Sequence, residues 1–191
     1  MNVWGTLFGI GLVAVVGTAC TKNDPTGSPG VPRGSSTMKI ESAAFAHHAE
    51  IPKKYTCEGE DASPPLSWSG VPDTAKSLAL IVDDPDAPDP AAPKRVWVHW
   101  VLYDIPPSTS SLAESAGPQA GGGKDGKNDW GKAGWGGPCP PIGRHRYFFK
   151  LYALDTALQL ASPTKAELEK AMEGHVLAQT ELVGTYKKTA Q

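Results

Sequence analysis

Three apolar runs of strand length, separated by proline-rich turns instead of helices, constrain the fold of this chain more than any other feature. The run "SLALIVDD" (77–84) is apolar up to its acidic end, which predicts a strand buried on both faces. The runs "RVWVHWVLYDI" (95–105) and "RYFFKLYALD" (146–155) are rich in β-branched and aromatic residues, as strands are. With 21 glycines and 18 prolines among 191 residues, the chain has many turns and short elements. The pattern predicts a mainly β fold, an antiparallel β-sandwich.

Two more strands frame this pattern, and turns connect its members. The segment "MKIESAAFA" (38–46) predicts a short opening strand, and the alternation in "VLAQTELVGTY" (176–186) predicts a closing one. The connecting segments are rich in proline and predict turns: "SPPLSWSGVPD" (63–73), "DPDAPDPAAP" (84–93) and "IPPSTSS" (105–111).

One C-terminal helix is predicted in "SPTKAELEKAMEGH" (162–175). Ser162 or Thr164 can cap its first turn, and Glu167 stands three residues after Thr164, as in a capping box. Gly174 can end the helix.

A long loop precedes the last of the three strong strands. Residues 115–141 contain nine glycines and no strand or helix pattern. Loops of this length inside a compact domain are usually functional or disordered. We expect a function, because the loop leads directly into "GGPCPPIGRHRYFF" (136–149), where chemically active residues are dense.

The N-terminal segment differs from the rest of the chain. The uncharged run "LFGIGLVAVVGTAC" (7–20) is short for a membrane span and is typical of a signal peptide, predicted at 1–19. The small residues before Cys20 resemble a bacterial lipobox, which predicts lipidation of Cys20; an ordinary signal peptide or a weak N-terminal anchor is the alternative. Residues 20–37 then form a flexible Pro/Gly/Ser-rich linker, and 38–191 form the folded domain.

This organisation predicts an exported protein that a lipid anchors to a membrane of the bacterial cell envelope. A soluble periplasmic or secreted protein is the alternative. Disulfides persist in such compartments, so Cys57 and Cys139 form either a disulfide or two small buried thiols. The net charge of −2 and the lack of a basic stripe argue against nucleic acid as a partner.

A histidine interrupts one of the predicted strands. By alternation, His99 shares a face with Trp97 and Val101, whereas Val98 and Trp100 take the opposite face. A lone histidine in such a strand is more often a core residue than a ligand-binding one. Acidic residues at the end of the preceding strand favour a functional role if the loops converge there.

A second histidine begins the strand "RYFFKLYALD" at its loop end. His145 and Tyr147 alternate onto one face, whereas Arg144 and Arg146 take the other. A histidine and a tyrosine on one face at the mouth of a strand make a pair of hydrogen-bond donors. The alternative is exposure to solvent at the start of a strand.

The acidic loop suggests a role for these histidines. No CxxC, HxxxH, HExxH or GxSxG motif is present, so neither a metal site nor a serine nucleophile is predicted. A carboxylate beside an imidazole favours the charged ring, which donates from both nitrogens. Asp84 or Asp86 can thus hold and charge His99 and His145, which then donate to an anion.

Three segments in this order resemble the phosphatidylethanolamine-binding protein family: "DPDAP" (84–88), "WVHW" (97–100) and "GGPCPPIGRHRYFFKLYALD" (136–155). The bacterial YbhB/YbcL branch, also called Raf kinase inhibitor-like, is the most similar. "YTCEGEDASPPLSWSGVP" (55–72) and "HVLAQTELVGTY" (175–186) resemble that branch as well. The resemblance spans residues 38–188 and implies an antiparallel β-sandwich with a small anion-binding pocket.

The resemblance also implies which residues form the pocket. By motif matching, the ligand-binding residues are Asp84, Pro85, Asp86, His99, Gly137, Pro138, His145 and Tyr147. Trp135 stands where the bacterial pattern has tyrosine, which keeps an aromatic ring at the rim.

These observations predict a non-enzymatic protein that binds a phosphate-like anion or a phospholipid head group, without cofactor or metal. Two alternatives remain. The first is an inhibitor of a protease or kinase, in which the loop 121–137 inserts into the partner. The second is a hydrolase that uses Asp84, His99 and His145.

Overall fold

The computed structural model describes residues 38–189. The predicted signal peptide, the lipidation site Cys20 and the linker all lie outside these residues. Among the helices that the structure describes, none is long and apolar enough to cross a membrane.

Two antiparallel sheets form the domain, as the strand pattern predicts. The three-stranded sheet has the order β1-β2-β5, with bounds Lys39–Glu41, Leu66–Ser69 and Ser111–Leu112. The five-stranded sheet has the order β6-β4-β3-β7-β8. Its bounds, in that order, are Lys124–Asp125, Trp97–Ile105, Ser77–Asp84, Arg144–Leu154 and Val176–Lys187. Two 3₁₀ turns, η1 (Lys53–Tyr55) and η2 (Ala120–Gly122), lie in the connections.

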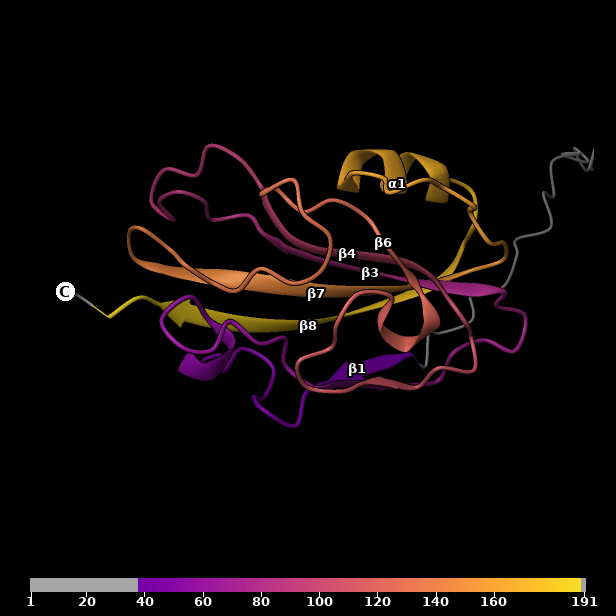
Figure 1. Ribbon diagram of the computed structural model, residues 1–191, viewed down its shortest axis with the longest axis horizontal. Helices are drawn as coiled ribbons and strands as arrows, with labels where there is room; N and C mark the ends of the chain where they lie inside the picture. Colours follow the sequence, from indigo (N-terminus) through magenta and orange to yellow (C-terminus); the bar gives the residue numbers. More distant parts are fainter. Residues whose placement is uncertain (1–37, 190–191) are drawn as a thin grey trace, which may run out of the picture. The chain divides into compact units, whose positions relative to one another are not determined.

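The main core lies between the two sheets. Ile40, Leu66 and Trp68 of the small sheet pack in one cluster with apolar residues of the large sheet, among them Leu80 and Trp100. In Figure 1, β1 lies on one side of the five-stranded sheet and α1 (Lys165–Met172) on the other. The fold is therefore a mainly β sandwich with one helix near its C-terminus, and the predicted fold class is confirmed.

Helix α1 covers the outer face of the large sheet. Leu168 and Met172 pack there on Ile81 and Val101 in a second apolar cluster. The helix begins with the predicted capping box: the Thr164 side chain accepts from the Glu167 backbone N–H, and the Glu167 carboxylate accepts from that of Thr164.

The proline-rich segments contain short strands that we predicted as turns. Strand β2 lies inside "SPPLSWSGVPD", where Leu66 and Trp68 point into the core while Ser67 and Ser69 are exposed. Strand β5 begins at the last residue of "IPPSTSS", and β6 lies in the long loop and pairs with β4. Strand β2 is short because the prolines before it lack the N–H group that a longer ladder needs.

Candidate functional site

A cavity of about 360 Å³ opens at one end of β3, β4 and β7, and we call it the aromatic cavity. The two loops at this end, 85–96 and 126–143, supply the rest of its wall. Its lining residues are Asp84, Ala87, Pro88, Trp97, His99, Trp130, Cys139, Pro140, Pro141, His145 and Tyr147. Four of the predicted ligand-binding residues are thus brought together here: Asp84, His99, His145 and Tyr147.

A register shift in β4 aims His99 at this cavity. Val82 pairs with Trp100 and Asp83 pairs with Val98, so His99 has no partner on β3. Such bulges re-aim side chains and are frequent next to active sites. The shift puts Val98 in the α1-side cluster and Trp100 in the main core. Our prediction that these two residues share a face was wrong, because simple alternation does not hold across a bulge.

His99 is a neutral base and not the charged donor that we expected. Its Nδ1–H donates to the Gly136 carbonyl at 2.6 Å, which leaves Nε2 with the lone pair. Burial lowers the pKa of the ring to about 4. Nε2 is buried and has no hydrogen-bond partner among the described residues. No carboxylate is hydrogen-bonded to this ring, and desolvation outweighs the Gly136 hydrogen bond and the more distant charges of Asp83 and Asp129.

Tyr147 lies beside His99, with the two rings edge to face and their centroids 5.1 Å apart. The side chain is fully buried, and its hydroxyl has no partner among the described residues. Burial raises the pKa of Tyr147 far above its ordinary value. The phenol therefore stays protonated and offers a free O–H donor to the cavity.

His145 is buried and both of its ring nitrogens are engaged. Nδ1 lies 2.7 Å from Asp84 Oδ2, and Nε2 donates to the Ile142 carbonyl at 2.9 Å. Desolvation raises the pKa of Asp84, although the hydrogen bond to His145 opposes the rise. Asp84 thus holds His145, as predicted, but the ring has no free N–H for an anion. The expected donation from His145 to a ligand is not available in this arrangement.

Asp86 binds an arginine instead of a histidine. Its carboxylate accepts from Arg146 Nε and Nη2 at 2.9 and 2.6 Å, and from the Arg146 backbone N–H. These bonds lower the pKa of Asp86. Pro85, Asp86, Gly137 and Pro138 are not among the residues that line the cavity. As direct ligand contacts, these four remain predictions without a place in the cavity wall.

The model of the phosphatidylethanolamine-binding protein family matches residues 41–187. The chain belongs to this family. A UPF0098 protein of Methanothermobacter thermautotrophicus is 52% identical over 156 residues, covering 79% of this chain and 99% of the relative. A UPF0098 protein of Chlamydia muridarum is 48% identical and covers 79% of this chain and 99% of the relative.

Solved structures of the family share the fold. A phosphatidylethanolamine-binding protein homologue from Chlamydia trachomatis has a TM-score of 0.74 at 47% identity, covering 81% of this chain and 100% of that chain. YbcL of E. coli has a TM-score of 0.70 at 33% identity, covering 80% and 99%. The assignment to the YbhB/YbcL branch within the family stays a prediction.

The long loop of this family member builds one wall of the cavity, a role that its composition does not reveal. Asn128 shapes the loop: its side-chain oxygen accepts from the backbone N–H groups of Trp130 and Lys132, and its amide donates to the Gly134 carbonyl. Trp130 then packs edge to face on His99. Sequence reasoning missed Asn128, although an asparagine in a glycine-rich loop is a known turn signal.

Two contacts hold the end of the loop against the segment that follows η1. Cys57 and Cys139 form a disulfide, which settles the alternative left open by the sequence. Beside it, the Gly137 N–H donates to Asp61 Oδ1 at 2.7 Å. A Cβ at Gly137 would overlap Asp61 and the Tyr55 carbonyl, so only glycine fits. Gly137 thus positions the cavity wall without lining it.

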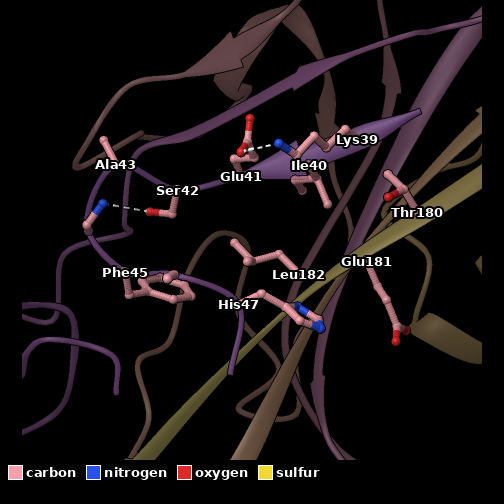
Figure 2. A pocket seen from close by; sticks show the side chains of 12 residues that line it. Lys39, Ile40, Glu41, Ser42, Ala43, Phe45, His47, Thr180, Glu181 and Leu182 are labelled. Atoms are coloured by element: carbon pink, nitrogen blue, oxygen red, sulfur yellow. Dashed lines mark hydrogen bonds and ion pairs between the residues drawn. The ribbon is translucent and has the colours of Figure 1, made fainter. Parts of the chain in front are cut away.

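A larger hollow of about 650 Å³ lies near β1 and β8 but lacks the features of a site. Figure 2 shows two pairs among its polar groups: Lys39 binds Glu41 at 2.6 Å, and Ser42 Oγ accepts from the Ala44 N–H. His47 Nδ1 accepts from the Val183 N–H. Among residues 38–189, no three His, Cys, Asp or Glu side chains are grouped so as to hold a metal ion.

Proposed function

We propose that this protein binds a small phosphate-like group in the aromatic cavity and acts without catalysis, as a binding protein of the cell envelope. The observation that carries the proposal is a pair of buried polar atoms, His99 Nε2 and the Tyr147 hydroxyl, that have no partner among the described residues. Such atoms are costly unless something binds them. Both belong to side chains that line the same cavity.

The rest of the wall supports a binding role. Trp97 and Trp130 meet edge to face at 5.3 Å, and three prolines complete an apolar surround. Ligand sites are typically apolar cavities with a few placed polar groups. Asp84 and His145 are hydrogen-bonded to each other, which fixes both side chains in the wall of the aromatic cavity. The hydrolase alternative needs these two groups free, and here each holds the other.

Calorimetry with inorganic phosphate tests the proposal. Tyr147→Phe removes the free donor, so we expect about tenfold weaker binding, which corresponds to one hydrogen bond. Tyr152→Phe is the matched control, because it removes a hydroxyl from the same strand outside the aromatic cavity. Equal affinity of Tyr147→Phe and the wild type would contradict the proposed site. Turnover of a phosphate ester by the purified protein would contradict the non-enzymatic role.

The envelope location rests on the lipobox-like sequence at Cys20. We expect a palmitate analogue to label the full chain in bacteria and the Cys20→Ser variant to lose both the label and membrane association. Continued labelling of Cys20→Ser would contradict a lipid anchor at this residue.

A further inference from the structure

The aromatic cavity presents one free acceptor next to free donors. His99 Nε2 carries a lone pair, because Nδ1 holds the ring proton for the Gly136 carbonyl. The Tyr147 hydroxyl and Trp97 Nε1 are donors without a partner among residues 38–189. A ligand that satisfies this set must bring a hydrogen-bond donor and an acceptor on neighbouring atoms.

The other polar groups of the wall are already engaged. Asp84 Oδ2 pairs with His145, and Asp84 Oδ1 accepts from the Asp86 N–H at 2.8 Å. His145 has no ring nitrogen left. The donor for His99 Nε2 must therefore come from the ligand.

We propose that the cavity takes a phosphate-like group that keeps a proton on the oxygen facing His99, so that free phosphate and phosphate monoesters are its ligands and phosphate diesters are not. This inference rests on the proposed function and deepens it. The P–OH donates to His99 Nε2, and a neighbouring oxygen accepts from Tyr147. A diester anion carries only acceptors and leaves Nε2 unpaired.

The charge of the cavity agrees with a singly charged ligand. None of the described residues that line it is lysine or arginine. Arg146 is bound to Asp86, and Arg95 lies over the Trp97 ring and pairs with Asp129 at 2.7 Å. A dianion would be buried without a free cation, which is costly. Protonation of one oxygen removes half of that charge.

The charged groups around His99 do not convert it into a donor. Asp83 faces away from the cavity and binds Lys150 and Lys165. Asp129 is paired with Arg95, and Asp84 with His145. Desolvation outweighs these carboxylates, and the ring keeps its low pKa. Protonating His99 to receive a diester is therefore unfavourable at neutral pH.

Binding should consequently take up a proton when the free ligand lacks one. The second pKa of a phosphate monoester is about 6. At about pH 8 the free ligand is a dianion and takes up about one proton on binding, whereas at about pH 5 it already carries that proton. Affinity for monoesters should rise as the pH falls through this range.

Calorimetry of the wild-type full chain with three probes tests the inference without any variant. Inorganic phosphate and methyl phosphate should bind, and dimethyl phosphate should bind at least about tenfold more weakly. The same titrations at about pH 8, in two buffers of different ionisation enthalpy, should show uptake of about one proton. Phosphate binding without methyl phosphate binding would overturn the inference, because monoesters would then be excluded as well as diesters.

Equal affinity for dimethyl and methyl phosphate, or binding of methyl phosphate without proton uptake at high pH, would overturn this inference and leave the proposed function standing. If none of the three probes binds, the proposed function itself is wrong. His99→Gln sharpens the test, because a glutamine amide can donate where Nε2 accepts. We expect this variant to lose the preference for the monoester, whereas the exposed His175→Gln keeps it.

Discussion

Two adjacent aspartates at the end of β3 are both buried, yet their surroundings differ completely. Asp83 faces α1, and the Nζ atoms of Lys150 and Lys165 each lie 2.9 Å from its carboxylate. Asp84 faces the aromatic cavity and holds a single histidine, His145. The Asp83 carboxylate links β7 to α1, because it binds one lysine from each. The Asp84 carboxylate positions His145 in the wall of the aromatic cavity.

Two buried tyrosines repeat this contrast. On the α1 side, the Tyr103 hydroxyl donates to the Leu160 carbonyl at 2.7 Å and accepts from the Ser162 N–H. On the cavity side, the Tyr147 hydroxyl has no partner among the described residues. Buried polar groups are normally paired, so an unpaired hydroxyl on a side chain that lines a cavity indicates a place for a ligand. The difference between the two faces separates structural polar residues from candidate binding residues.

The largest expected effect lies on the structural side. Asp83→Asn removes the buried anion that Lys150 and Lys165 share, leaves Lys165 with Glu169 alone, and should lower the free energy of unfolding by about 4 kcal/mol. Urea denaturation measures the change, and phosphate affinity should stay at the wild-type value. Asp155→Asn is the control, since its exposed pair with His175 contributes at most about 1 kcal/mol. Weaker phosphate binding by Asp83→Asn would break the proposed separation of the faces.

The sequence predicted Asp84 as a site residue but left Asp83 without a role. Strand β3 itself was predictable to the residue, because a continuous apolar run has few alternatives in a chain with so many turns. The partners of Asp83 lie 67 and 82 residues further along the chain, at Lys150 and Lys165. Such pairings depend on the arrangement of strands and helix, which a local pattern does not contain.

The next effect concerns pH and the cavity side. Burial lowers the pKa of His99 from 6.5 to about 4, so between these values the unfolded chain binds one more proton than the folded one. Stability should therefore fall by about 3 kcal/mol as the pH falls from 6.5 to 4. The raised pKa of Asp84 acts in the opposite direction in acid, so the useful quantity is the difference between wild type and His99→Gln. If the free energy of unfolding changed with pH in the same way in the wild type and in His99→Gln, His99 would not be buried in its neutral form.

The orientation of His99 shows where sequence reasoning ended. Alternation correctly placed His145 and Tyr147 on a buried face and Arg144 and Arg146 outside. It failed at His99, because a one-residue bulge in β4 changes the faces on either side. It also gave His99 a charged form and both histidines a free N–H for an anion, since nothing local reveals that Gly136 and Ile142 supply carbonyl acceptors.

A smaller effect is expected when Asp84 is changed. Asp84→Asn removes the charged partner of His145 and should cost about 2 kcal/mol of stability, the contribution of one charge-assisted hydrogen bond. Unlike Asp83→Asn, it should also weaken phosphate binding several-fold, because His145 is part of the cavity wall. Thermal unfolding and calorimetry on the same samples give both quantities. Unchanged affinity in this variant would make Asp84 a structural residue of the same kind as Asp83.

The smallest change compares the two tyrosines directly. Tyr103→Phe leaves the Ser162 N–H and the Leu160 carbonyl without their partner and should cost about 1 kcal/mol. Tyr147→Phe removes a hydroxyl that has no partner among residues 38–189, so the unliganded protein should keep its stability or gain up to about 1 kcal/mol. We expect urea denaturation to show a lower free energy of unfolding for Tyr103→Phe and an equal or higher one for Tyr147→Phe. If only Tyr147→Phe also weakens phosphate binding, the Tyr147 hydroxyl serves binding at the expense of stability. A loss of stability in Tyr147→Phe equal to that in Tyr103→Phe would mean that its hydroxyl already has a structural role.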